Sequence, residues 1–166
     1  MQRGSLELIL TTRKTAGEHS PVRPAGASST RRRILVVDDH PLVRRVLRAL
    51  IDNESDLRVC AEAATHQEGL AAIVPTRPDL VIADLSLGAG NGLAMLKDIR
   101  ARHTHLPVLV LSMHDASLYA ERALRAGANG YVSKQEMGET LLVAIRCVLG
   151  GDTYISPEIR TGLDGQ

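Results

Sequence analysis

The chain of 166 residues lacks tryptophan and phenylalanine, and three tyrosines are its only members of the Phe, Tyr and Trp class. Because 44% of the residues are hydrophobic, the chain can still bury a sizeable core, which must then be aliphatic. The two cysteines, Cys60 and Cys147, are too few and too far apart in sequence for a disulfide framework or a zinc site. We expect both to be reduced and buried as small hydrophobic side chains.

The sequence also lacks any apolar run near the ~20 residues that a helix needs to cross a bilayer. Its apolar patch LELIL (residues 6–10) is interrupted by Glu7 and is too short for the hydrophobic region of a secretory signal. We therefore expect a cytoplasmic protein with no membrane partner.

Positive charge is concentrated at the amino terminus. Residues 1–33 carry seven Arg or Lys and two Glu, a net charge of +5, whereas the whole chain carries +1. The segment is rich in Gly, Ser, Thr and Pro and has no sustained periodicity, which predicts a basic disordered leader over residues 1–32. A basic leader can contact nucleic acid or a membrane surface, but a solvated tail is the simpler interpretation.

From Arg33 onward, short apolar runs alternate with longer stretches of helical spacing. The runs lie at residues 34–37, 57–63, 80–83, 108–111 and 130–133. The first helical stretch has an apolar face made of Leu42, Val43, Val46, Leu47, Leu50 and Ile51. Strands without polar alternation, each followed by a helix, predict a parallel sheet covered on both faces. The fold class is therefore a doubly wound five-stranded α/β domain.

One carboxylate interrupts the third apolar run, LVIADLSL. Burying an ionised carboxylate costs several kcal/mol unless it has a partner, so Asp84 needs either a partner or a use. All strands of a parallel sheet end at one edge, where ligands bind. Polar side chains occupy four of these strand ends: Asp38 and Asp39, Asp84, Ser112, and Lys134. Lys134 is one of three lysines in a chain with seventeen arginines.

Three carboxylates at one edge repel one another unless a cation joins them. Oxygen ligands without converging His or Cys suit a hard ion, and we expect Mg²⁺. A magnesium ion, a lysine and a hydroxyl around a carboxylate nucleophile are suited to phosphoryl transfer. The alternative is that the acids only cap the helices that follow their strands.

These residues resemble the receiver domains of bacterial two-component response regulators, which are CheY-like. The resemblance covers roughly residues 33–150 and rests on four motifs in family order and spacing: VVDDHPLVR, VIADLSL, VLVLSMHD and GANGYVSK. It implies a (βα)5 flavodoxin-like fold with strand order 2-1-3-4-5. It also implies a phosphoacceptor switch rather than an enzyme, with only self-phosphorylation and slow self-dephosphorylation chemistry.

The resemblance assigns the metal site. By it, Asp84 is the residue that a sensor histidine kinase phosphorylates. Asp39 and Asp84 bind Mg²⁺ directly, the backbone carbonyl of Ser86 completes the ligands from the protein, and Asp38 acts through water.

The resemblance also assigns the groups that meet the phosphoryl group. Lys134 pairs with it, and the Ser112 hydroxyl and the Met113 backbone N–H donate hydrogen bonds to it. Ser112 and Tyr131 form the switch, in which the tyrosine changes rotamer. His114 modulates the access of water to the phosphoryl group.

Two positions beside these motifs carry further expectations. His40 begins a helix next to the pocket, and we expect it at the rim rather than in catalysis. Gly88 stands where the family usually has proline, which makes the conformation of the following loop less certain but removes no catalytic group.

The motif DDHPLVR and the ending GGDTYISPEI resemble the NarL/LuxR-type branch, in which the receiver controls a DNA-binding helix-turn-helix domain. Residues 151–166 are expected to begin the linker, and they leave no room for that output domain. We therefore expect either a receiver from a longer transcription regulator, which would contact DNA only through the missing domain, or a stand-alone receiver that signals by binding another protein.

Two other functions remain open on the sequence. An Asp-nucleophile phosphohydrolase normally has a second acid two residues after the nucleophile, where this chain has Ser86. A degenerate receiver that works without phosphorylation conflicts with the complete set of acids, hydroxyl and lysine.

For the favoured switch, we expect phosphorylation-enhanced homodimerisation through one of two surfaces. One is formed by the fourth helix, fifth strand and fifth helix. The other is formed by the first and fifth helices, where Arg44, Arg45 and Arg48 would meet Glu136 or Glu139 of a second copy.

Overall fold

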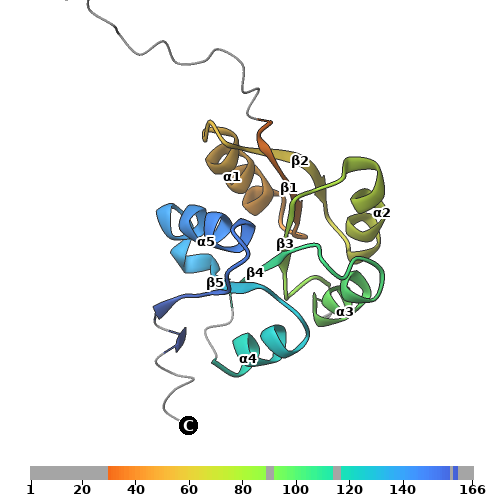
Figure 1. The fold of residues 1–166 in the computed structure, drawn as a ribbon, viewed down its shortest axis with the longest axis vertical. Coiled ribbons are helices and arrows are strands. Elements are labelled where there is room, and N and C mark those ends of the chain that lie inside the picture. Colours follow the sequence, from red (N-terminus) through yellow and green to blue (C-terminus); the bar gives the residue numbers. More distant parts are fainter. Residues whose placement is uncertain (1–29, 89–91, 114–116, 158, 161–166) are drawn as a thin grey trace, which may run out of the picture.

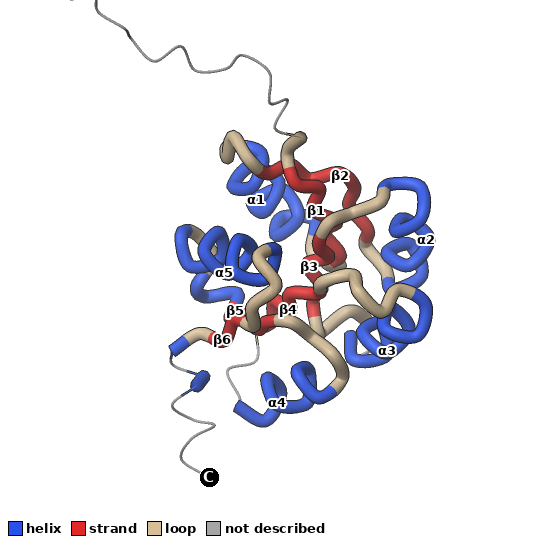
Figure 2. Tube along the Cα trace, viewed as in Figure 1, coloured by secondary structure: helices blue, strands red, loops and turns tan. Residues whose placement is uncertain are grey.

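The computed structural model describes residues 30–88, 92–113, 117–157 and 159–160, which form a parallel sheet between two layers of helices (Figures 1 and 2). The strands are β1 (Arg32–Val37), β2 (Leu57–Ala63), β3 (Leu80–Asp84), β4 (Val108–Ser112), β5 (Gly130–Ser133) and β6 (Tyr154–Ile155). The helices are α1 (Pro41–Asp52), α2 (His66–Thr76), α3 (Gly92–Arg102), α4 (Ser117–Arg125) and α5 (Glu139–Leu149), with a 3-10 turn at Lys134–Glu136.

In the described part of the chain, the sheet has the order β2-β1-β3-β4-β5-β6, and each strand pairs in parallel with its neighbours. The predicted doubly wound fold and the order 2-1-3-4-5 are therefore confirmed. Alternate side chains of each strand point to opposite faces, which divides the core in two. Leu35 and Val37 pack with α2, α3 and α4, whereas Ile34 and Val36 pack with α1 and α5. The core is aliphatic apart from Tyr131, as the composition predicts.

A sixth strand extends the predicted five. Tyr154 and Ile155 pair with Gly130 and Tyr131, and the Tyr154 N–H donates to the Asn129 carbonyl at 3.1 Å. This pairing depends on Gly130, because a Cβ there would lie 2.9 Å from the Tyr154 carbonyl oxygen. The sheet therefore continues past Gly150, into the stretch that the sequence assigns to a linker.

The expected burial of the cysteines needs correction, and the apolar face of the first helix is only partly buried. Cys60 and Cys147 are free thiols, but both are half-buried rather than buried. On α1, Leu47 and Ile51 are buried, but Leu42 and Val46 are exposed, Leu42 at 70%. The apolar stripe of this helix is thus wider than the surface that the sheet covers.

Glycine at residue 92 lets α3 begin close to the end of β3. A Cβ at Gly92 would lie 2.4 Å from the Leu85 Cα and 2.7 Å from the Asp84 carbonyl oxygen, distances that real side chains do not reach. The start of α3 therefore lies directly against the backbone of Asp84 and Leu85. This contact fixes the first residues of the β3–α3 loop at the carboxyl edge of the sheet.

Candidate functional site

A buried ion-pair triad at the carboxyl edge of the sheet gives Asp84 its partner. Asp84 ends β3, Asp38 follows β1, and both are 1% exposed. Lys134 follows β5, and its Nζ lies 2.8 Å from Asp84 Oδ2 and 2.6 Å from Asp38 Oδ2. One ammonium thus joins two carboxylates that come from different strands, because parallel strands end side by side.

The environment of Lys134 keeps it charged. Desolvation by burial lowers the pKa of this ammonium, but hydrogen bonds to Asp38 and Asp84, together with their charges, outweigh it and raise the pKa above its ordinary value. A compact cation is therefore held permanently between the two carboxylates at neutral pH.

Asp39 and His40 extend the acidic cluster towards solvent. Ligand atoms of Asp38, Asp39, His40 and Asp84 all lie within 4.8 Å of one another. His40 Nδ1 is 2.7 Å from Asp39 Oδ1 and 3.3 Å from Asp38 Oδ1. His40 is exposed, as a rim position requires, but it lies closer to the acids than the sequence indicates. The position of His40 directly after Asp38 and Asp39 in the sequence could have indicated this closeness.

The donor set of this cluster fits a hard divalent cation. Three carboxylates face the single ammonium of Lys134, which leaves negative charge that a small cation can neutralise. Asp39 and His40 are exposed, so an ion can enter from solvent. The alternative that the acids cap helices fails at α1, where His40 is the N-cap residue.

The remaining predicted residues lie at the same edge or beneath it. Ser86 is half-buried, and its backbone N–H donates to Asp84 Oδ1 at 2.9 Å, which orients the carboxylate. Ser112 is fully buried at the end of β4 and pairs with Ser133 of β5, while Met113, next in the chain, is exposed. Tyr131 is fully buried in the cluster beneath α2, α3 and α4. His114 lies outside the described residues.

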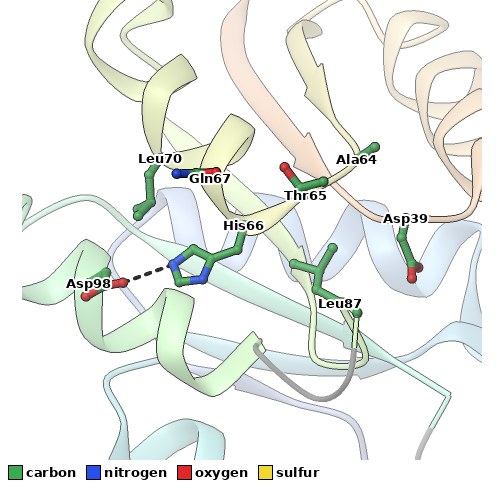
Figure 3. Close-up of a pocket in the computed structure, with 9 residues that line it drawn as sticks. Asp39, Ala64, Thr65, His66, Gln67, Leu70, Leu87 and Asp98 are labelled. Carbon is green, nitrogen blue, oxygen red and sulfur yellow. Dashed lines mark ion pairs between the residues drawn. The ribbon is translucent and has the colours of Figure 1, made fainter.

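A cavity that the sequence did not reveal lies beside the acids (Figure 3). It has a volume of about 570 Å³ between α2 and α3, and Asp39, Leu70, Leu87 and Gly88 are among its lining residues. His66 on α2 and Asp98 on α3 close one side through an ion pair of 3.0 Å between Nε2 and Oδ2. These residues come from separate elements without a shared motif, so no sequence signal joins them.

The fold and the acidic edge define a signalling domain of known type. The chain belongs to the response regulator receiver domain family, whose model matches residues 34–146. Receiver domains are parts of signalling proteins. These domains bind Mg²⁺ at an acidic pocket, interact with histidine kinases and dimerise. None of the helices in the described part of the chain is long and apolar enough to span a membrane.

Curated relatives place the chain among two-component response regulators. It is 33% identical over 128 residues to the nitrate/nitrite response regulator protein homolog of Haemophilus influenzae, covering 77% of this chain and 62% of that protein. It is 35% identical over 132 residues to the oxygen regulatory protein NreC of Staphylococcus carnosus, covering 79% and 61%. The chain thus spans about three fifths of the length of these relatives.

Solved structures agree with this assignment. A two-component response regulator of the LuxR family from Aurantimonas sp. SI85-9A1 superposes with a TM-score of 0.78 at 36% identity, covering 81% of this chain and 96% of that one. The isolated receiver domain of RcsB from Salmonella enterica serovar Typhimurium, at 21% identity, shares the fold with a TM-score of 0.74, covering 80% and 99%. The predicted resemblance to NarL/LuxR-type receivers is therefore confirmed.

Proposed function

We propose that Asp84 accepts a phosphoryl group from a phosphohistidine of a sensor histidine kinase. A carboxylate oxygen of Asp84 forms the new O–P bond as the P–N bond to the kinase imidazole breaks. The observation that carries this proposal is the buried triad, in which Lys134 contacts Asp84 and Asp38 at 2.8 and 2.6 Å. The ammonium is positioned to stabilise charge on the transferred oxygens.

Bound Mg²⁺ would supply the remaining positive charge, and its ligands would be Asp39, Asp84 and the Ser86 carbonyl, with Asp38 acting through water. The Lys134 ammonium, the Ser112 hydroxyl and the Met113 N–H would then hold the phosphoryl oxygens, and His114 would modulate the approach of water. Ser112 and Tyr131 would transmit the change to the surface.

Incubation with acetyl phosphate and Mg²⁺, followed by intact-mass measurement, tests the proposal directly. A phosphoacceptor gives one stoichiometric phosphoryl adduct that decays slowly. A phosphohydrolase gives continuous phosphate release over many cycles with little adduct, and that result would replace the proposed function.

The magnesium assignment predicts that Asp39→Ala removes the response to Mg²⁺. The same change should stabilise the metal-free protein, because it relieves repulsion among the acids. We expect a gain below about 1 kcal/mol, since solvent screens the exposed Asp39 charge. NMR shifts or thermal melting with added Mg²⁺ measure both effects in this tryptophan-free chain.

Asp152→Ala is the matched control, because Asp152 is an exposed acid on the segment after α5, away from the acidic cluster. It should leave the magnesium response unchanged. An Asp39→Ala protein that binds Mg²⁺ with wild-type affinity would show that Asp39 is not a ligand.

The output is proposed to be transcription control in the cytoplasm, through a helix-turn-helix domain outside these residues. One relative, 29% identical over 130 residues, is a transcriptional regulatory protein, DegU of Brevibacillus brevis. Paired receivers would bring two such domains onto one DNA site. A stand-alone receiver that binds another protein is the alternative output.

For homodimerisation, the structure favours the surface formed by α1 and α5. Both helices cover one face of the sheet, and Leu42 on α1 and Val143 on α5 are 70% and 56% exposed (Figure 1). On the other candidate surface, β6 covers the free edge of β5. Arg44 and Arg48, two of the arginines predicted to contact the second copy, pair with Glu62 of their own chain, so a dimer contact through them would have to replace these ion pairs.

We expect phosphorylation to tighten the dimer constant by roughly 5- to 150-fold, the usual range of coupling between two sites. Sedimentation with and without beryllofluoride, a phosphoryl mimic, measures this change. Ser112→Ala should weaken the response while sparing phosphorylation, and Leu42→Glu should weaken the dimer in both states. An unchanged monomer distribution at high micromolar concentration would favour the stand-alone receiver.

A further inference from the structure

The cavity between α2 and α3 has a chemistry that the proposed phosphoryl transfer does not use (Figure 3). Two carboxylates line it: Asp39, which it shares with the acidic cluster, and Asp98 of α3. Leu70 and Leu87 give it apolar walls. Acidic groups combined with apolar walls fit a cation on an alkyl stem, which describes a lysine or arginine side chain. The volume of about 570 Å³ is large enough for several side chains of a peptide.

Among the described residues, the rim of the cavity has space for such a segment at Gly88. This glycine has φ +43°, in the left-handed region, and a Cβ added there would meet no described atom within 4 Å. On the opposite side, the His66–Asp98 ion pair holds α2 and α3 together. Asp98 is only half-buried, so its carboxylate remains accessible to a second cation.

We propose that this cavity binds Arg13 and Lys14 of the chain's own amino-terminal segment when Asp39 holds no metal ion. Charge complementarity supports this occupant, because residues 1–33 carry a net +5 from seven basic and two acidic side chains. The segment is also tethered to the domain, so its effective concentration at the cavity is in the millimolar range. A weak contact is therefore occupied without a separate partner.

Reach decides which basic residues can bind. The segment joins β1 at the amino edge of the sheet, and the seven residue-to-residue steps from Arg32 to Asp39 span about 23 Å to the carboxyl edge. Passing around α2, with a diameter of about 10 Å, lengthens the path to roughly 35–40 Å. The Cα of Arg23, eight residues before Arg31, lies at most about 28 Å from the Arg31 Cα, so even a fully extended chain brings its side chain only to the near limit of this path, whereas the Cα of Arg13 can lie up to about 63 Å away. Arg23 is therefore too close in sequence to Arg31 to occupy the cavity.

Docking would couple the segment to the metal site through Asp39. A basic side chain beside this carboxylate competes electrostatically with Mg²⁺, and by linkage each weakens the binding of the other. The amino-terminal segment thus acts as a tethered inhibitor of magnesium binding. This coupling rests on the proposed function, because it takes Asp39 as a ligand, whereas the docking itself does not.

The test compares full-length variants by ¹⁵N–¹H NMR without metal at low salt. Arg13→Gln/Lys14→Gln should shift the amides of Thr65, His66, Gln67 and Gly88, and high salt should shift the wild-type amides the same way. The matched control Arg23→Gln should leave these amides in place. A spin label at Ala16→Cys, with Cys60 and Cys147 changed to Ser, should broaden the same amides selectively.

The magnesium titration is a separate measurement. The double variant should bind Mg²⁺ about 2- to 5-fold more tightly than wild type or Arg23→Gln, as expected for removal of a weak tethered competitor. If Mg²⁺ fails to bind any of these proteins, the metal assignment is wrong, but the amide shifts still decide the docking.

Two outcomes would overturn the proposal. Cavity amides that ignore the double variant, salt and the label would show that the segment does not dock. Shifts that grow with protein concentration would assign the occupant to a second copy of the chain.

Discussion

Asp84→Asn abolishes phosphoryl labelling by acetyl phosphate or by a kinase, while the domain stays folded. Asparagine keeps the shape and can still accept the hydrogen bond from the Ser86 N–H, but it has no anionic oxygen to attack phosphorus. We expect the rate of adduct formation to fall by about 10³-fold or more, as expected when a nucleophile is removed. Intact-mass spectrometry measures the adduct, and circular dichroism verifies the fold.

Asp152→Asn serves as the control, because Asp152 is an exposed carboxylate on the segment after α5, away from the acidic cluster. It should label fully. Labelling of Asp84→Asn at the wild-type rate would mean that another residue is the phosphoacceptor.

Lys134→Met lowers the stability of the metal-free domain by about 3–5 kcal/mol, the range for breaking a buried ion pair by removing one partner. The loss is large because Asp38 and Asp84, both 1% exposed, would remain without their shared cation. Urea unfolding measures the change. Mg²⁺ should restore part of the stability, since it replaces some of the missing positive charge.

Lys97→Met tests the same substitution at an exposed site on α3 and should change stability by less than about 0.5 kcal/mol. Equal stability of the Lys134 and Lys97 variants would mean that the triad contributes nothing to the fold.

The stability gained from Lys134 has a defined pH window. Burial lowers the pKa of this ammonium, but the hydrogen bonds and charges of Asp38 and Asp84 raise it further, so the folded-state pKa lies above the unfolded value. Because the pKa is raised, the ammonium stabilises the fold fully at pH values below the unfolded-state pKa of about 10.4. This stabilisation is lost as the pH rises through the folded-state pKa. On the alkaline side, the stability difference between wild type and Lys134→Met should therefore be constant near neutral pH and shrink in strong alkali, where Lys134 loses its proton.

Strand positions were predictable wherever apolar runs were continuous. The predicted runs at 57–63 and 130–133 coincide with β2 and β5, and the others differ by one or two residues at their ends. The two-residue β6 was not predictable, because its place depends on the missing side chain of Gly130 and on packing against distant residues. A contact of this kind leaves no local pattern in the sequence.

The convergence of site residues was predictable for a topological reason: parallel strands deliver their last residues to one edge. The individual pairings were not. Lys134 contacts Asp38 and Asp84, whereas Asp39 contacts His40, and this division depends on where each side chain points after the strand ends. The cavity beside Asp39 depends on the distance between α2 and α3, which no motif encodes.

The burial of Tyr131 gives the protein an internal optical reporter. Tyr119 and Tyr154 are partly exposed, so Tyr131 is the one tyrosine held rigidly in an asymmetric interior. Without tryptophan or phenylalanine, near-ultraviolet circular dichroism then comes mainly from this ring, which lies in β5 between Val110 of β4 and Ile155 of β6. A change of the Tyr131 rotamer on phosphorylation would therefore be visible by circular dichroism in the unlabelled protein.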